Sequence, residues 1–232
     1  MDYSYIDENY NEIKGKILEA TARAGREEPP VFLAAIKSAE ADEVNYLCRA
    51  HGITEVGENR VQQLLARYDA LDKDIMNIHF IGSLQTNKVK YIVDKVCMIH
   101  SLDRVELARE IDKQAKKIGK VMDVLVEINI GREEKKGGVL PEDAEQFCRD
   151  ISAFENIKLC GFMTMAPKCE KKSDFLKYFC ETYQLVLDIW QKKLHNINRP
   201  IISMGMSESF EEAIECGSTM VRIGRSLFNK KV

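Results

Sequence analysis

Residues 29–51 read PPVFLAAIKSAEADEVNYLCRAH, and the fold prediction rests on this stretch. After the two prolines, residues 31–37 form a continuous apolar run, which is typical of a strand buried on both faces. Residues 41–51 then show the apolar spacing of a helix. A buried strand followed directly by a helix is the repeating unit of parallel α/β folds.

The same alternation continues to the end of the chain. Further apolar runs occupy residues 53–58, 77–82, 95–100, 121–130, 158–165, 199–205 and 218–224. Helical patterns separate them at residues 59–68, 86–93, 103–119, 141–152, 173–193 and 209–217, with a short last turn at 225–228. Eight strands alternating with helices, without a low-complexity linker, predict an α/β fold, a single (β/α)8 TIM barrel domain over residues 1–232, rather than an open doubly wound sheet.

An amphipathic segment precedes the first of these units. Ile6, Tyr10, Ile13 and Ile17 follow one another at spacings of four, three and four residues, which places them on one face of a helix. The sequence therefore predicts an extra N-terminal helix packed against the barrel.

Charge and hydropathy exclude several classes of partner. The formal net charge is -3, with 34 basic and 37 acidic side chains intermixed, so there is no basic stripe for nucleic acid. No apolar stretch approaches the roughly 20 residues that span a bilayer, and the N-terminus lacks the pattern of a signal peptide. We expect a cytoplasmic protein that binds neither nucleic acid nor membranes.

Seven cysteines are scattered along the chain without a C-x-x-C pair. Their odd number argues against a full disulfide framework, and their spacing matches no metal site. We expect most of them to be buried thiols and expect no metal ligands.

Polar residues follow the last apolar residue of most predicted strands. In a parallel barrel this is the end where functional groups lie. The residues concerned are Lys37, Gly57 to Asn59, Gly82 and Ser83, Asn129, Thr164, Ser203 to Ser207, and Arg222 to Arg225.

Lys37 is the candidate on which the functional prediction depends. Alternation along residues 31–37 places Val31, Leu33, Ala35 and Lys37 on one face, and if that face lines the barrel, the amine emerges at its mouth. A lysine partly shielded from water there offers a neutral amine that can attack an aldehyde. The alternative is a strand-end lysine that reaches into solvent.

The segments SMGMS (203–207) and VRIGRS (221–226) predict a phosphate site. In such barrels the loops after strands seven and eight commonly hold a phosphate group. Ser207 is positioned to cap a helix at FEEAIE, Gly224 permits close backbone approach, and Arg222 or Arg225 could supply charge. The alternative is that Ser207 is only a cap and the arginines are surface residues.

Two further segments are open to two interpretations. A histidine inside a strand, such as His79, is more often a satisfied core residue than a catalytic base. Lys135 and Lys136, in the loop GREEKKGG (131–138), form by default a solvated charge run, although lysines in a mobile loop beside an aldehyde cofactor could be secondary acceptors.

Together these motifs resemble the YggS/PROSC-like pyridoxal-phosphate homeostasis protein family, in order and over nearly the whole chain. The matching segments are AAIKSA (34–39), VGENRVQQ (56–63), IHFIGSLQTNKVK (78–90), SLDRVELA (101–108), GFMTMAP (161–167) and SMGMSESFEEAIECGSTMVRIG (203–224). The resemblance implies the barrel found in the N-terminal half of alanine racemase. It also implies that pyridoxal 5'-phosphate (PLP) is bound as a Schiff base on Lys37.

The resemblance assigns further residues to the cofactor site. It implies that Asn59 lies over the cofactor ring and that Ser207, Arg222 and Gly224 surround the phosphate and ring. It places His79, Ile81, Met163, Ser203 and Met206 at matching barrel-mouth positions, and Lys136 matches a family loop lysine. The residue after RIG varies in the family, so a cofactor contact of Arg225 is doubtful, and the loop lacks the serine often found before its lysine.

Three functions remain open at this point. The resemblance favours a PLP carrier involved in intracellular PLP homeostasis, without established catalysis and with apo-enzymes as possible recipients. An amino-acid racemase needs a second acid/base group, which in alanine racemase is a tyrosine from a second domain, and we expect none here. A lysine-dependent aldolase usually places its lysine on a later strand. We expect a monomer.

Overall fold

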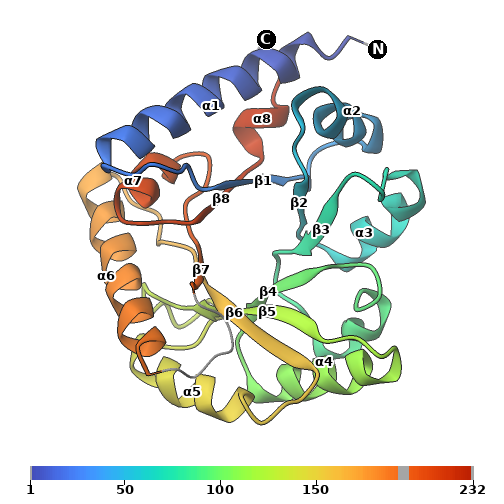
Figure 1. The fold of residues 1–232 in the computed structure, drawn as a ribbon, viewed down its shortest axis with the longest axis vertical. Helices are drawn as coiled ribbons and strands as arrows, with labels where there is room; N and C mark the ends of the chain where they lie inside the picture. The colour runs from blue at the N-terminus through green and yellow to red at the C-terminus, as the bar shows by residue number, and fades with distance from the viewer. Residues whose placement is uncertain (1, 193–198, 231–232) are drawn as a thin grey trace.

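Eight parallel strands close into a barrel in the order β1 to β8 (Figure 1). The computed structural model describes residues 2–192 and 199–230. The strands are β1 (Val31–Ala35), β2 (Glu55–Glu58), β3 (Asn77–Phe80), β4 (Met98–Leu102), β5 (Met122–Ile128), β6 (Ile157–Thr164), β7 (Ile201–Ser203) and β8 (Met220–Ile223). The predicted TIM barrel is confirmed.

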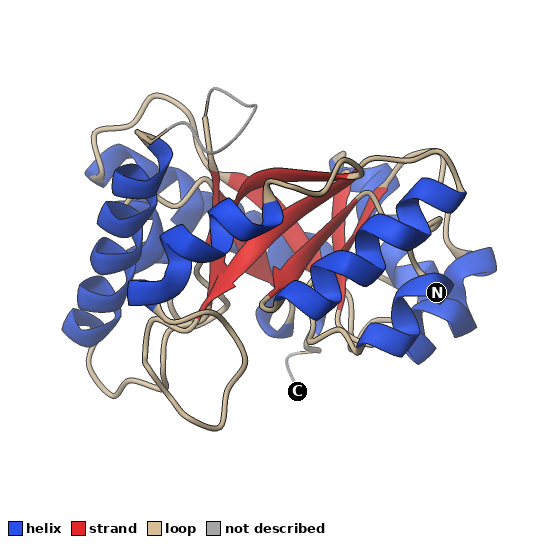
Figure 2. Cartoon of the chain, turned by 90° about the horizontal axis from the view of Figure 1, so that it is seen from below, coloured by secondary structure: helices blue, strands red, loops and turns tan. Residues whose placement is uncertain are grey.

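Helices surround the barrel on its outer side (Figure 2). They are α1 (Ser4–Arg23), α2 (Ala41–His51), α3 (Val61–Arg67), α4 (Val105–Lys117), α5 (Ala144–Ile151), α6 (Lys172–Trp190), α7 (Phe210–Glu215) and α8 (Arg225–Phe228). Short 3-10 helices are η1 (Tyr68–Ala70), η2 (Thr86–Tyr91) and η3 (Pro141–Asp143). None of the described helices is long and apolar enough to cross a membrane.

Several element boundaries differ from the sequence prediction. β1 ends at Ala35, so Lys37 lies in the following turn rather than in the strand. β4 begins at Met98 instead of residue 95, because the backbone N–H groups of Lys95 and Val96 donate to Ile92 O in a turn. The helix predicted at 86–93 is the 3-10 segment η2, and the predicted end at Lys193 lies outside the described residues.

Apolar side chains fill both faces of the sheet. The larger core lies between the strands and the helices, and it includes Phe80, Phe162 and Phe179. Inside the barrel there are two smaller clusters, one of Leu33, Ala35, Ile81 and Met220 and one of Met98, Leu125, Cys160 and Met163. The expected inward row of β1 is therefore confirmed at Leu33 and Ala35, whereas Val31 is exposed.

The predicted N-terminal helix is present and packs against the C-terminal elements α7 and α8. Its apolar row of Ile6, Tyr10, Ile13 and Ile17 is buried. The Asn9 side-chain amide donates to two carbonyl oxygens near the end of the chain, Leu227 O at 3.0 Å and Asn229 O at 3.0 Å. The first helix thus holds the last strand–helix unit, and both chain ends lie on this side of the barrel (Figure 1).

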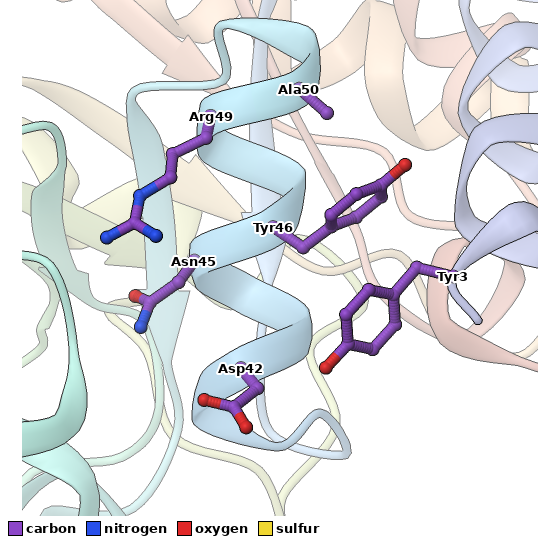
Figure 3. Close-up of a pocket in the computed structure, with 6 residues that line it drawn as sticks. All are labelled: Tyr3, Asp42, Asn45, Tyr46, Arg49 and Ala50. Carbon is purple, nitrogen blue, oxygen red and sulfur yellow. The ribbon is translucent and has the colours of Figure 1, made fainter. Parts of the chain in front are cut away.

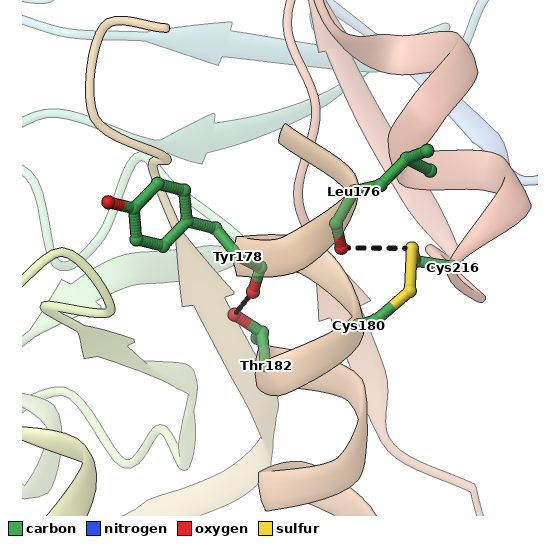
Figure 4. The surroundings of a disulfide bond; sticks show 5 residues. All are labelled: Leu176, Tyr178, Cys180, Thr182 and Cys216. Atoms are coloured by element: carbon green, nitrogen blue, oxygen red, sulfur yellow. Dashed lines mark hydrogen bonds between the residues drawn. A yellow bond between two sulfur atoms is a disulfide. The ribbon is translucent and has the colours of Figure 1, made fainter. Parts of the chain in front are cut away.

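A disulfide joins Cys180 on α6 to Cys216 at the end of α7 (Figure 4). The sequence did not predict this pairing, because the two residues are 36 positions apart and no pattern relates them. Of the remaining cysteines, Cys48, Cys148 and Cys160 are buried, Cys169 is half-buried and Cys97 is exposed. The expectation of mostly buried thiols therefore holds for three of the seven.

Candidate functional site

Lys37 lies between the carboxyl ends of β2 and β8. The N–H of Ile36, the preceding residue, donates to Gly57 O on β2 at 2.9 Å. On the other side, a Cβ on Gly224 would lie 2.4 Å from Ala35 O, so only glycine allows β8 to run this close to β1. The Lys37 side chain is exposed, which corrects the expected partial shielding, since the strand stops two residues earlier than predicted.

Asn59 is held at the same end of the barrel by a buried carboxylate. Glu58 Oε1 accepts the backbone N–H groups of Asn59 at 2.6 Å and Arg60 at 3.2 Å. Arg67 Nε lies 3.6 Å from the other oxygen of this fully buried side chain. The buried Asn59 Oδ1 has no hydrogen-bond partner within residues 2–192 and 199–230, so it remains available as an acceptor for a ligand.

Two serines from different loops meet where the phosphate site was predicted. Ser226 N donates to Ser207 Oγ at 3.4 Å, which joins the loop after β7 to the turn after β8. Ser226 Oγ is buried and lacks a hydrogen-bond partner among the described residues. A buried hydroxyl without a partner is costly, so this pair fits an acceptor group such as a phosphate oxygen.

The expected helix cap at Ser207 is wrong. Helix α7 starts at Phe210, its N-terminal flanking residue is Ser209, and residues 207–209 form a turn instead. Gly205 in this loop has φ +92°, and a Cβ there would lie 2.6 Å from Ala213 Cβ. The loop therefore turns sharply before the helix, which directs Ser207 toward Ser226.

Arg222 is buried inside the barrel and is not a surface residue. Its guanidinium donates to Ser203 O at 2.7 Å, Ser203 Oγ at 2.8 Å and Thr164 O at 3.0 Å. No carboxylate within 4.0 Å pairs with it among the described residues. Burial lowers the pKa of Arg222 to about 10, and the charge of Glu127 partly offsets this effect. Arg225, by contrast, is exposed and pairs with Glu208 at 2.6 Å.

Glu127 on β5 is a further buried ionisable group whose charge acts on Arg222. Burial raises the pKa of its carboxyl to about 7, repulsion from Asp103 adds to the increase, and Arg222 opposes it. The sequence reasoning did not select Glu127, because a glutamate in an apolar strand gives no sign of which face it occupies.

Other predicted site residues lie deeper than the mouth. His79, Met163 and Ser203 are 3%, 1% and 0% exposed, and Ile81 belongs to an interior apolar cluster. Met206 is exposed at the surface of the loop after β7. His79 is hydrogen-bonded to His100 and Glu55, which fits the interpretation of a satisfied core histidine rather than a catalytic base.

Two surface features do not join this site. Lys136 forms an ion pair with Glu133 in its own loop at 2.5 Å, and Lys135 beside it is exposed, as a solvated charge run would be. A surface hollow is lined by helix α2 and Tyr3 and contains no strand-end residue (Figure 3). Its lining residues are Tyr3, Asp42, Asn45, Tyr46, Arg49 and Ala50.

Besides Glu127, sequence reasoning gave no role to two residues that the structure connects to the site, Ser226 and His100. Ser226 is the last residue of the segment VRIGRS, which was assigned to the phosphate site, but the serine itself was not singled out. His100 lies in the predicted fourth strand and was not selected, although a second histidine in an apolar run two elements from His79 could have been noted.

The described residues fit a phosphate-bearing aromatic aldehyde such as PLP. Lys37 offers an amine at the mouth, and the partnerless Ser226 Oγ beside Ser207 offers a hydroxyl pair for an anion. After β2, Asn59 Oδ1 provides a hydrogen-bond acceptor. On β8, the buried Arg222 guanidinium provides a cationic donor.

Comparisons with known proteins agree with this geometry. The model of the family "Alanine racemase, N-terminal domain" matches residues 2–231. A pyridoxal phosphate homeostasis protein from Aquifex aeolicus is 43% identical over 227 residues, covering 97% of each chain. The solved structure of PipY from Synechococcus elongatus PCC7942, with PLP bound, has a TM-score of 0.77 at 26% identity and covers 92% of this chain and 100% of that chain.

The likeness extends to the catalytic relatives of the fold. An alanine racemase from Clostridium difficile 630 has a TM-score of 0.75 at 20% identity, and the match covers 99% of this chain but 57% of the racemase. That likeness shows the fold alone. The chain belongs to the alanine racemase N-terminal domain family, and its curated relatives include pyridoxal phosphate homeostasis proteins.

Proposed function

We propose that this chain binds PLP covalently through Lys37 and takes part in intracellular PLP homeostasis, as a carrier or buffer rather than as an enzyme. The observation that supports this most is the unpartnered Ser226 hydroxyl beside Ser207, in the turn after β8, the strand that pairs with β1, after which Lys37 follows. It supplies an anion contact where an amine is also present.

Lys37 and PLP can form a Schiff base, and water can hydrolyse it again, without the help of another side chain. The lysine nitrogen replaces the aldehyde oxygen of PLP, the oxygen leaves as water, and hydrolysis of the C=N bond returns both partners. Because the Lys37 side chain is exposed, water and competing amines reach this bond. Such access favours release of the cofactor, as a carrier requires.

A racemase has less support. It needs a second acid/base group on the opposite face of the cofactor, and a tyrosine serves in that role in the related racemases. All eight tyrosines are described, and they lie on α1, α2, α6, η1 and η2 or just before α1, never on a strand. A lysine-dependent aldolase is also weakened, because Lys37 follows the first strand.

Transfer of the cofactor tests the proposal directly. PLP-loaded protein is mixed with an apo-enzyme and a phosphatase that consumes free PLP. We expect the apo-enzyme to gain activity at a rate that depends on the loaded protein, and no interconversion of alanine isomers. Steady racemisation that disappears in Lys37→Ala would contradict the carrier role and establish the racemase.

Removal of the Ser226 hydroxyl should weaken phosphate binding. We expect Ser226→Ala to raise the dissociation constant for PLP about tenfold or more, since hydrogen bonds to charged groups contribute about 1.5–3 kcal/mol. Absorbance titration measures this constant. Ser152→Ala, an exposed serine after α5, is the control, and pyridoxal without phosphate should bind equally to all three proteins. Equal loss of pyridoxal binding would show that Ser226 acts through structure instead.

A further inference from the structure

A row of hydrogen-bonded side chains crosses the barrel interior, and the proposed function uses only one of them, the Arg222 guanidinium. Glu55 Oε2 lies 2.5 Å from His79 Nε2, and His79 Nδ1 lies 2.9 Å from His100 Nε2. His100 Nδ1 is 3.4 Å from Ser203 Oγ, which also accepts from Arg222. We call Glu55, His79, His100, Ser203 and Arg222 the interior relay; its members come from β2, β3, β4, β7 and β8.

The barrel interior also contains two apolar clusters, and Ile201 packs against both of them. Leu33 and Met220 lie in one cluster, and Met98 and Met163 in the other. Burying imidazole and guanidinium groups costs free energy that apolar side chains of similar volume would not. Filling the barrel therefore does not require these residues.

The two ends of the interior relay fix the direction of its hydrogen bonds. Arg222 can only donate, so Ser203 Oγ accepts from it and retains a hydrogen of its own. Burial acts to raise the pKa of Glu55, but hydrogen bonds from His79 and Asn77 outweigh it and lower the pKa. Glu55 is therefore an acceptor at neutral pH, and His79 Nε2 must bear a hydrogen.

When His79 is neutral, the donor and acceptor of each remaining hydrogen bond are determined as well. Its Nδ1 is then an acceptor, so His100 must donate from Nε2. The Nδ1 atom of His100 is left as an acceptor for the Ser203 hydroxyl. Every donor in this state points from Ser203 toward Glu55.

Protonation of His79 reverses the direction of two hydrogen bonds, the one between His79 and His100 and the one between His100 and Ser203. His79 Nδ1 becomes a donor, so His100 Nε2 must accept, and the hydrogen of His100 moves to Nδ1. That hydrogen then points at Ser203 Oγ, which accepts from both His100 and Arg222 and turns its own hydrogen elsewhere. His100 itself stays neutral, because burial, His79 and Arg222 hold its pKa well below the usual value.

Only the Glu55 end of the interior relay is partly exposed to solvent. The Glu55 side chain is 21% exposed at the amino-terminal end of β2, whereas His100, Ser203 and Arg222 are buried. The charged and titratable groups around the relay are Cys97 before β4, Asp103 after it, Asp123 and Glu127 on β5, and the relay's own Glu55, His79 and Arg222.

We propose that the interior relay transmits the protonation state of His79 to the Ser203 and Arg222 side chains, with His100 as a positioning residue that changes tautomer. Protonation at the amino-terminal end of the barrel thereby alters hydrogen bonding at the buried guanidinium. The proposal rests on the proposed function only in that PLP is the ligand placed near Arg222.

The tautomers of His100 test the interior relay without any ligand. In protein labelled with 15N-histidine, two-bond nitrogen–proton NMR spectra distinguish Nε2–H from Nδ1–H. We expect His100 to change from Nε2–H to Nδ1–H as the pH falls, with the same midpoint as His79. A His100 tautomer that stays constant while His79 titrates would overturn the proposal.

The substitution Glu55→Gln should change the pH at which His100 changes tautomer. Glu55→Gln removes the negative charge that faces the His79 ring, so we expect the His100 tautomer change to require a lower pH. Glu106→Gln, an exposed glutamate on α4, is the matched control and should leave that pH unchanged. An unchanged midpoint in Glu55→Gln would contradict a relay that begins at Glu55.

The bound cofactor provides the second measurement. In the PLP-loaded protein, the visible absorbance should change with pH at the His79 midpoint and move with it in Glu55→Gln. If the absorbance did not change at this midpoint, the protonation state of His79 would not affect the bound PLP, and that part of the proposal would be wrong. Failure of wild-type protein to bind PLP would instead contradict the proposed function, and the NMR result without ligand would still decide the relay.

Discussion

Lys37→Ala should abolish covalent attachment of PLP to this protein. Wild-type protein mixed with PLP and reduced with borohydride should retain one PLP group on the peptide that contains Lys37, and the variant should retain none there. The reason is chemical, because an amine is needed to replace the aldehyde oxygen, and Lys37 is the lysine that lies between the ends of β2 and β8. Peptide mass spectrometry after reduction measures the label.

A second lysine variant controls for non-specific labelling. Lys158 lies at the start of β6, at the opposite end of the barrel, and pairs with Asp123 at 3.9 Å. Lys158→Ala should keep the full label at Lys37. If Lys37→Ala retained an equal amount of label at another lysine, such as Lys136, the assignment of Lys37 would be wrong.

Cys180→Ser should produce the largest loss of stability among conservative substitutions. The disulfide to Cys216 closes a loop of 36 residues, and constraint of the unfolded chain by such a loop contributes about 4 kcal/mol. Denaturant unfolding without reductant should show this difference, and reductant should lower the stability of wild-type protein toward that of the variant.

The control for this prediction is Cys97→Ser, which changes an exposed free thiol. It keeps the Cys180–Cys216 disulfide, so its free energy of unfolding, with and without reductant, should stay close to that of the wild-type protein. Thiol counting in denaturant without reductant should give five free cysteines in the wild-type protein. Seven free thiols, together with no effect of reductant, would contradict the disulfide.

The barrel could be predicted because its signals are local. Each buried parallel strand is a short apolar run bounded by a helix, so residues 31–37 and their repeats were enough to indicate the architecture. Strand ends were less certain, since apolar residues such as Val96 also pack outside a strand against the helices. This is why β4 begins later than its apolar run.

The site was predictable where one residue type allows few roles. Lys37 supplies an amine at the end of the first strand, and Gly224 permits the close approach of β8 to β1. Both roles were predicted from the residue type and its place in the chain. Ser207 was placed in the right loop but given the wrong role, because the turn at 207–209 depends on the contact of Gly205 with Ala213. The contact of His100 with Ser203 spans more than 100 positions, and that of Ser226 with Ser207 spans more than 15. Local sequence patterns do not reveal such distant pairs.

The packing of helix α1 against α7 and α8 has a consequence for how the chain is made. The first helix leaves the ribosome long before Leu227 and Asn229, whose carbonyl oxygens it holds. At typical rates of synthesis, its apolar stripe has no native cover for about 10–40 s. We therefore expect nascent chains that stop before residue 210 to associate with chaperones through Ile6 to Ile17, and completed chains to lose this association.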